Sequence, residues 1–394
     1  QMPDMVIRTG VCTGGLGMEN RIKEIALQAG AAGVGISSVD RLDASVPSMD
    51  PEYALPGARS IISVMMPLDG DVIRRYLGKE DHQPLQRHET EVYRDLFAVS
   101  ACIADFLTSH GNRAVAVEPN LDYRFKDGRK YRRIPFVWRQ KTAEWLSSSS
   151  GPLTTFFKRL LVQLLYEKTS DYTDWNLTPR FSHRYGAVAA GLAGFGWSGN
   201  VMSPQFGSRV LFDTVITDAG LASDPMLEES PCDGCRICTR VCQVGMIHET
   251  RESHVTIGGK RHTHAKRGHN LRCIFCCAGF TGQDLHRQWS TWSPGRISLP
   301  DNDDNIVEFW NTFAKENLWK HNYYSRCLSD LVFHSDYGFI RKPRDRFRTT
   351  CGNCQLVCWE TREQRRENYR ILTRGGVVVE GPDFSFRVVK GEGL

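Results

Sequence analysis

The spacing of the cysteines constrains this chain more than any other feature of its sequence. Residues 232–242 read C-D-G-C-R-I-C-T-R-V-C, so four thiols follow the pattern C-x2-C-x2-C-x3-C. Cys351, Cys354 and Cys358 form a second run, C-x2-C-x3-C. The first spacing is that of bacterial ferredoxins, in which three neighbouring thiolates bind one [4Fe–4S] cluster and the fourth binds the other cluster. The sequence therefore predicts two [4Fe–4S] clusters, which transfer electrons one at a time.

Two other uses of cysteine fit this pattern less well. Disulfide frameworks belong to short secreted domains with cysteines along their whole length, whereas eleven of the thirteen cysteines here lie beyond residue 231. A structural zinc site uses two cysteine pairs, whereas the first run alone supplies four thiols. Cys12 and Cys102 lie outside the runs and are expected to be small buried side chains.

The ferredoxin rule of crossed ligands assigns most of these thiols to a cluster. The first cluster is expected on Cys232, Cys235, Cys238 and Cys358, and the second on Cys242, Cys351 and Cys354. The fourth ligand of the second cluster stays open among Cys273, Cys276, Cys277 and Cys327, of which Cys273 and Cys327 are the main candidates.

The first half of the chain alternates between helical and strand patterns. ENRIKEIALQAG (19–30) and residues 90–110 have helical apolar spacing, whereas ARSIISVMMPL (58–68) and RVLFDTVITD (209–218) are apolar runs typical of buried strands. This alternation predicts a layered α/β domain. The acidic linker ASDPMLEESP precedes the cysteines, so we expect domains at 1–225 and 226–394 and an α+β fold overall.

The composition is ordinary for a folded protein of 394 residues, and it disfavours nucleic acid and membranes as partners. The formal charge of +5 is too small over this length to favour nucleic acid. No apolar run reaches the eighteen residues of a membrane helix, and residues 1–10 do not resemble a secretion signal. A cytoplasmic protein is the expectation, and an exported form whose leader has been removed stays open.

A glycine-rich loop offers a competing cofactor motif. Gly194, Gly196 and Gly199 form G-x-G-x-x-G, with Asp218 downstream, as in dinucleotide-binding loops. Such a loop follows a strand and begins a helix, whereas this one follows the helix-like AVAAGLA. The context therefore disfavours a nicotinamide cofactor.

Several segments resemble one enzyme superfamily. FGWSGNVMSPQFGSRVLFDTVITDAGL (195–221), ALPGARSIISVMMPL (54–68) and TTCGNCQLVCWE (349–360), together with the first cysteine run, resemble the cobalamin-dependent reductive dehalogenases and the related epoxyqueuosine reductases. The resemblance implies a nitroreductase-like α/β domain with base-off cobalamin, followed by a ferredoxin-like two-cluster module. It implies corrinoid contacts from Gly194, Gly196, Gly199, Asn200, Ser203, Pro204, Phe206 and Gly207.

The resemblance also implies catalytic residues. A tyrosine whose phenol is acidified by a nearby cation would supply the proton, and Tyr172, Asn176 and Arg209 are the candidate site residues. Tyr123, Tyr166 and Tyr185 compete with Tyr172 as the donor, and His183 is another possible acid. GNVMSPQFGSRV is closer to the dehalogenases, and DWNLTPRFSHR (174–184) lacks the Asp-Thr-Gly-Pro of the epoxyqueuosine reductases. The expectation is therefore reductive cleavage of a carbon–halogen bond in a small organohalide.

Two alternatives stay open at this point. An epoxyqueuosine reductase would contact tRNA through the basic residues 124–141. A pure electron carrier would need only the cluster module, which makes the long first half hard to explain. In a dehalogenase or an epoxyqueuosine reductase, an external ferredoxin or flavodoxin would supply electrons. The basic runs 260–269 and 341–348 would be its docking surfaces.

Overall fold

A four-stranded antiparallel sheet lies at the centre of the first half of the chain. The computed structural model describes residues 17–117, 123–124, 178–277, 279–284, 286, 288–317, 351–381 and 386–390. The strands are β1 (Gly33–Ser38), β2 (Ser60–Pro67), β8 (Val210–Thr217) and β3 (Ala114–Val117), in that order across the sheet. Every neighbouring pair is antiparallel. β8 therefore inserts between β2 and β3 from a distant part of the sequence.

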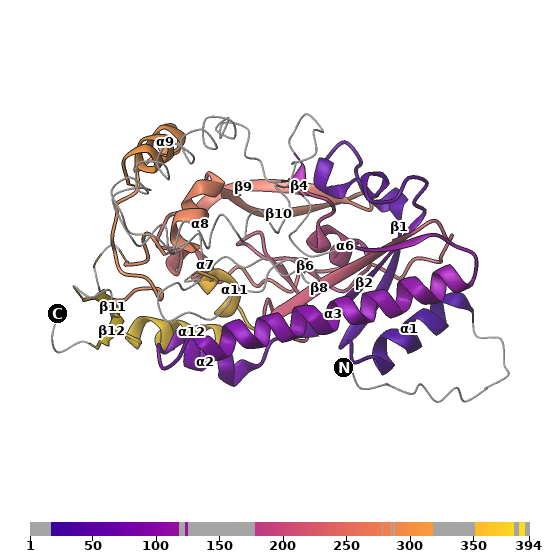
Figure 1. Ribbon diagram of the computed structural model, residues 1–394, viewed down its shortest axis with the longest axis horizontal. Coiled ribbons are helices and arrows are strands. Elements are labelled where there is room, and N and C mark those ends of the chain that lie inside the picture. Colours follow the sequence, from indigo (N-terminus) through magenta and orange to yellow (C-terminus); the bar gives the residue numbers. More distant parts are fainter. Residues whose placement is uncertain are drawn as a thin grey trace, which may run out of the picture.

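Helices cover both faces of this sheet because β2 and β8 are apolar on both sides. Ile62 and Val64 point into one apolar cluster with α1 (Met18–Gln28) and α3 (Gln83–Ser109). Ile61 and Met65, the alternate residues of β2, pack against α6 (His183–Ala189). In Figure 1, α3 runs along β2 and β8, with α1 beside it. Strands buried on both faces have continuous apolar runs, which is the pattern that predicted them.

The strand and helix predictions for this half are largely confirmed. The helix predicted at 19–30 is α1, and its chain direction changes at Gly30, whose φ is 98°. The segments 58–68 and 209–218 form β2 and β8, and the helical pattern at 90–110 is part of the longer α3. The combination of helices with antiparallel sheets confirms α+β. Neither the nitroreductase-like nor the ferredoxin-like module is identified by these elements, and both stay predictions.

The short strands β6 (Gly194–Phe195) and β7 (Val201–Met202) precede β8. The helices of the second half are α7 (Ile237–Arg240), α8 (Asn270–Cys277), α9 (Ile306–Asn317), α11 (Asn353–Leu356) and α12 (Arg362–Arg374). A hairpin joins β9 (Ile247–Ile257) to β10 (Lys260–Arg267), and β11 (Val377–Glu380) pairs with β12 (Phe386–Val389). The pair β4 (Tyr123–Arg124) and β5 (Thr178–Pro179) completes the strands, and α2 (Gly70–Leu77) lies beside α12.

One apolar cluster continues across the predicted domain boundary near residue 226. Leu77 of α2 and Leu96 of α3 belong to the same buried cluster as Leu356 of α11 and Leu372 of α12. The Trp292 indole also donates a hydrogen bond to the Tyr76 carbonyl at 2.9 Å. The two sequence halves therefore share core packing, and the division at 225/226 stays a prediction. Among the described residues, no helix combines the length and apolar character needed to span a membrane.

The basic run 260–269 is only partly exposed. On β10, His262 and His264 contact the ring of Phe195, and the Lys260 ammonium donates to the Leu227 carbonyl at 2.9 Å. Arg261 and Thr263 alternate with them and are exposed, and Lys266 is exposed at the register shift between Ala265 and Arg267. Half of the run therefore packs against the protein because strand side chains alternate between faces. The other run, 341–348, lies outside the described residues.

A buried lysine predicts a pH-dependent stability. Lys79 follows α2, is 4% exposed, and donates to the Leu372 carbonyl at 3.4 Å. Burial, with the nearby Lys390 ammonium, lowers the pKa of Lys79 to about 7. The unfolded chain, with a lysine pKa of about 10.4, then binds more protons than the folded chain between about pH 7 and 10. Stability should rise with pH across this window, by at most about 1.4 kcal/mol per unit.

Lys79→Met should remove this dependence and stabilise the protein near pH 7, because methionine fills the site without a charge to desolvate. Unfolding midpoints measured from pH 6 to 10 check this expectation. Lys266→Met, at an exposed position on β10, is the matched control and should keep the wild-type profile. A Lys79→Met profile parallel to wild type would contradict the assignment.

Candidate iron-sulfur and cofactor site

The first cysteine run folds into a tight loop followed by α7. Gly234 and Arg236 have positive φ angles of 70° and 60°. The Asp233 carboxylate accepts a hydrogen bond from the Cys235 backbone N–H at 3.1 Å. Because glycine adopts positive φ without strain and the Asp233 side chain supports the turn, the loop can curl around an enclosed space.

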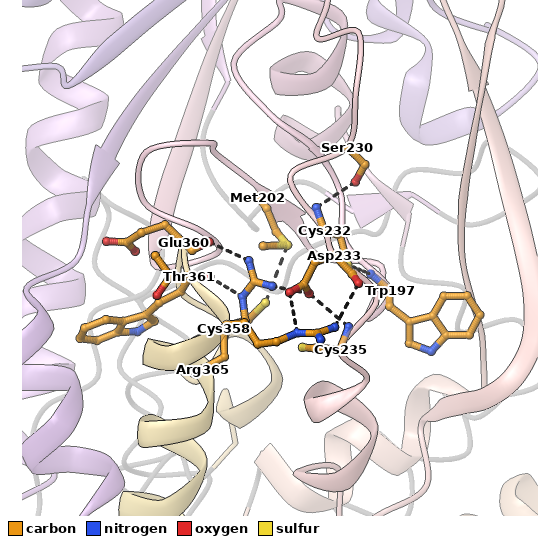
Figure 2. A network of polar contacts seen from close by, with 12 residues as sticks. Trp197, Met202, Ser230, Cys232, Asp233, Cys235, Cys358, Glu360, Thr361 and Arg365 are labelled. Atoms are coloured by element: carbon orange, nitrogen blue, oxygen red, sulfur yellow. Dashed lines mark hydrogen bonds and ion pairs between the residues drawn. The ribbon is translucent and has the colours of Figure 1, made fainter.

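Four cysteines line a cavity between this loop and the second run. The second run forms α11, a single helical turn that packs against α7. The cavity is lined by Cys232, Cys235, Cys238 and Cys358, and also by Trp197 and Arg365. Figure 2 labels Cys232, Cys235 and Cys358 from the two runs. These four cysteines, the first thiol group, are the set that the crossed-ligand rule predicts for the first cluster.

A second set of thiols lies beside the first. Cys242, Cys273 and Cys351 pack around Val244, Met246 and Cys276. Cys354 is close enough to Cys242 and Cys351 for their charges to raise its pKa. Cys242, Cys273, Cys351 and Cys354 are called the second thiol group. Cys354 and Cys358 lie on either side of one helical turn, so the two groups are neighbours.

Cys276 and Cys277 adjoin the second thiol group. Hydrogen bonds from their thiols lower the pKa of Cys351, and the same contact raises the pKa of Cys276. Cys273 is influenced by Cys351, Cys242 and Cys354 together. Three of the candidates for the fourth ligand, Cys273, Cys276 and Cys277, therefore meet here. Cys327 lies outside the described residues.

The chemistry of both thiol groups fits bound iron. Burial raises the pKa to about 12 for Cys273, Cys354 and Cys358 and also raises the pKa of Cys238. A buried thiolate therefore needs a cation, which cluster iron supplies. Within the described residues, no three His, Cys, Asp or Glu side chains are placed to hold a single metal ion.

Several N–H groups point at the sulfurs, and the Arg267 guanidinium is one of them, at 4.0 Å from Cys273 Sγ. The Trp197 backbone N–H donates to Cys232 Sγ at 3.3 Å, and the Met246 backbone N–H donates to Cys242 Sγ at 3.2 Å. The Asn200 side-chain amide donates to Cys354 Sγ at 3.4 Å. Such hydrogen bonds stabilise negative charge on sulfur and tune the potential of a cluster. These donors therefore contact sulfurs that are predicted to bind iron.

A larger cavity of about 230 Å³ lies next to the second thiol group, between α6 and β8. Its walls include Tyr93, Ser182, His183, Asn200, Phe212 and Gln355. Asn200 thus lines the cavity and donates to Cys354. Sites for drug-sized ligands are about 300–1,000 Å³, so the described residues enclose room for only part of a corrinoid. The mixture of amide, hydroxyl and apolar groups suits the amide-fringed edge of such a macrocycle.

His183 is the buried titratable group of this cavity. Its Nδ1 lies 3.0 Å from the Thr214 hydroxyl and 3.6 Å from Asp213 Oδ1, and its Nε2 is buried without a hydrogen-bond partner. Burial lowers the pKa of His183 to about 4. The imidazole is therefore neutral near pH 7, which suits it to accept or donate one hydrogen bond through Nε2 rather than to serve as a standing acid.

The glycine-rich loop packs mainly against the cysteine segments. A side chain at Gly194 would meet Pro231, and one at Gly196 would meet Met202. Gly199 and Gly207 have positive φ angles of 78° and 58°. Ser203 and Pro204 line a second, more open pocket with Glu360, and Phe206 lies beneath the Arg209 guanidinium. Of the residues expected to contact the corrinoid, Asn200 lines the cavity between α6 and β8, and the corrinoid contacts of all of them stay predictions.

Arg209 lies in the second half of this loop region and contacts protein groups. Its guanidinium donates to the Leu68 carbonyl at 3.1 Å and to Glu360 Oε1 at 3.4 Å, and it stacks on Trp359 at 5.1 Å. These contacts connect β8 to the segment after Cys358. The catalytic role expected for Arg209 stays a prediction. Tyr172 and Asn176 lie outside the described residues, as do most of residues 124–141.

Comparison with known proteins gives matches among solved structures. No family model and no curated protein sequence matches the chain. A catabolic reductive dehalogenase, NpRdhA, is 14% identical over 65% of this chain and 28% of its own, with a TM-score of 0.41. Another solved reductive dehalogenase structure, described as suggesting a mechanism for B12-dependent dehalogenation, is 13% identical over 83% of this chain and 37% of its own, also with a TM-score of 0.41.

An epoxyqueuosine reductase bound to a tRNA stem loop is also similar. It is 14% identical over 91% of this chain and 81% of its own, with a TM-score of 0.38. Both families that the sequence resembles are therefore among the structural neighbours. The chain spans well under half the length of the two dehalogenase chains.

Some residues and contacts around the thiols were not predicted from the sequence. Trp197 donates to Cys232 Sγ and Arg365 lines the first cavity, whereas Asn200 was expected to contact the corrinoid and not to donate to Cys354 Sγ. No spacing rule links such distant positions. Asp233 had the clearest signal, because a carboxylate within C-D-G-C can support the turn between two ligands.

Proposed function

We propose that this chain is a reductase in which two [4Fe–4S] clusters pass electrons to a corrinoid at the cavity between α6 and β8, where a carbon–halogen bond is cleaved. The observation that carries the proposal is the position of Asn200. Its amide hydrogen-bonds to Cys354 of the second thiol group, and the same side chain lines the cavity. A cluster on those thiols would therefore be one side chain away from a bound cofactor.

The order of the sites supports a path for electrons. Asp233 and Gly234, in the loop of the first thiol group, are exposed. Cys354 of the second thiol group is linked to the cavity through Asn200, and it lies four residues from Cys358 of the first thiol group. Electrons from an external ferredoxin or flavodoxin would enter at the first cluster, pass to the second, and leave toward the cavity.

The residues of the chain have defined tasks in this reaction. Two electrons and one proton convert an organohalide to the hydrocarbon and a halide ion. When bound, the clusters supply single electrons and the corrinoid supplies the cobalt at which the halide is removed. Asn200 positions the Cys354 sulfur, His183 offers a neutral nitrogen to the cavity, and the apolar walls of Phe212 and Val201 exclude water. Tyr172 remains the proposed proton donor.

Cofactor extraction tests this proposal most directly. Protein produced anaerobically with B12 available should release a corrinoid with its characteristic absorption spectrum and contain about eight irons per chain. Reductive dehalogenation of halogenated aromatics should follow with a chemical reductant. The absence of any corrinoid in iron-replete protein would leave an electron carrier, and turnover of queuosine-precursor tRNA instead of organohalides would make it an epoxyqueuosine reductase.

A further inference from the structure

A buried guanidinium lies beside the first thiol group. The Arg365 side chain is 2% exposed. It donates to the Trp359 carbonyl at 2.5 Å, the Glu360 carbonyl at 2.9 Å and Asp233 Oδ1 at 2.6 Å. Figure 2 shows these contacts between the segment after Cys358 and the loop that contains Cys232 and Cys235. The arginine therefore joins the two sequence segments that supply the first thiol group.

The start of α12 explains why Arg365 points there. Thr361 caps the helix, and its side chain and that of Gln364 form reciprocal hydrogen bonds with the backbone. This capping box fixes the first turn of α12 directly after Cys358. Arg365 follows the capping box and folds back over the Trp359 and Glu360 carbonyls. The fixed first turn of α12 therefore determines where the Arg365 side chain lies beside the thiols.

The charge of Arg365 is only partly balanced. Asp233 is its carboxylate partner, but the Asp233 side chain is 37% exposed and also accepts a hydrogen bond from Arg362 at 3.0 Å. A second guanidinium, Arg236, lines the same cavity and lies over Trp197. Water screens the exposed carboxylate more than the buried guanidinium. The surroundings of the first thiol group are thus net positive.

We infer that Arg365 is a positioning residue whose fixed charge raises the reduction potential of the cluster on the first thiol group, and that Asp233 opposes it. This inference rests on the proposed two-cluster function. Reduction adds one negative charge to a cluster, and a permanent cation in a weakly polarisable environment stabilises the reduced form. Charge and hydrogen bonds around the sulfurs are known determinants of cluster potential. The cluster nearest the surface would then accept electrons readily from the external donor.

Opposite charge changes at one ion pair test the inference. Arg365→Gln removes the cation and should make the first cluster harder to reduce, by about tenfold in the ratio of reduced to oxidised cluster at a given potential, or about 59 mV for one electron. Asp233→Asn removes the anion and should shift the same potential upward. Arg365→Lys keeps the charge and should restore most of the wild-type potential. The readout is a redox titration of reconstituted protein followed by electron paramagnetic resonance.

The control is Arg370→Gln, an exposed arginine on the same helix whose partner is Glu367 at 2.9 Å. It should leave both cluster potentials unchanged, because solvent screens its charge. Iron content and melting temperature are measured for every variant, so a variant that fails to fold is recognised. If Arg365→Gln does not fold, the potentials of Asp233→Asn and Arg365→Lys still test whether the charge of Arg365 raises the potential of the first cluster.

Several results would overturn the inference. Arg365 is only structural if Arg365→Gln lowers the melting temperature without moving a potential, or if Asp233→Asn shifts the potential in the same direction as Arg365→Gln. Movement of both clusters by equal amounts would also contradict a local effect. Failure of the proposed function is separate, since wild-type protein without cluster signals rejects the clusters themselves, and clusters without a corrinoid leave the role of Arg365 intact.

Discussion

Cys235→Ser should reduce the iron content from about eight to about four per chain, because it removes one of the thiolates of the first thiol group while leaving the second group complete. Cys235 lines the first cavity with the other three thiols. Cys354→Ser should produce the converse loss, since Cys354 belongs to the second thiol group. The double variant should contain little iron. Iron and sulfide assays on anaerobically reconstituted protein measure these losses.

Cys102→Ser is the matched control for both changes. Cys102 lies on α3, is half-buried, and is not part of either thiol group. Its replacement should leave about eight irons. About four irons in the wild-type protein, or the same spectral loss in Cys235→Ser and Cys354→Ser, would contradict the two-cluster assignment.

The cysteine spacing predicted the first thiol group because cluster ligation is a local rule. Cys232 and Cys235 lie in one loop and Cys238 in the helix α7 that follows it, and the crossing of Cys358 to them follows from the ferredoxin pattern. The buried strands β2 and β8 were equally predictable, since continuous apolar runs indicate burial on both faces. The fourth ligand of the second cluster could not be predicted for a physical reason. Cys273 lies beside the second thiol group because of how α8 is rotated, and no spacing rule fixes that rotation.

Other features depend on contacts between distant segments. The G-x-G-x-x-G pattern follows α6, as its sequence context indicated, yet sequence alone did not indicate that its glycines pack against Pro231 and Met202. The basic run 260–269 looked like one charged surface, but strand alternation turns His262 and His264 toward Phe195. Arg209 and Arg365 look alike in sequence. In the structure, Arg209 forms an ion pair with Glu360, whereas Arg365 lies against the first thiol group.

Gly207 shows most clearly how the loop supports the cluster site. The structure holds its neighbour Ser208 against the second run: the Ser208 N–H donates to the Cys358 carbonyl at 2.7 Å, and its hydroxyl donates to the Gln355 carbonyl at 2.7 Å. A Cβ at Gly207 would lie 2.5 Å from the Cys358 carbonyl oxygen and 2.6 Å from Trp359 Cα. Only glycine allows these two chain segments to lie so close together.

Gly207→Ala should therefore destabilise the protein by about 2–5 kcal/mol, from a left-handed alanine together with overpacking against backbone, and should displace Cys358 from the first thiol group. Iron should fall toward four per chain. Gly111→Ala separates the two causes, because Gly111 also has a positive φ, 83°, but its Cβ would meet open space. That control should cost only about 1–2 kcal/mol and keep all its iron. Denaturant unfolding and iron assays on both variants make the comparison. If the two variants lose equal stability and Gly207→Ala keeps all its iron, the close approach to Cys358 does not hold the first cluster in place.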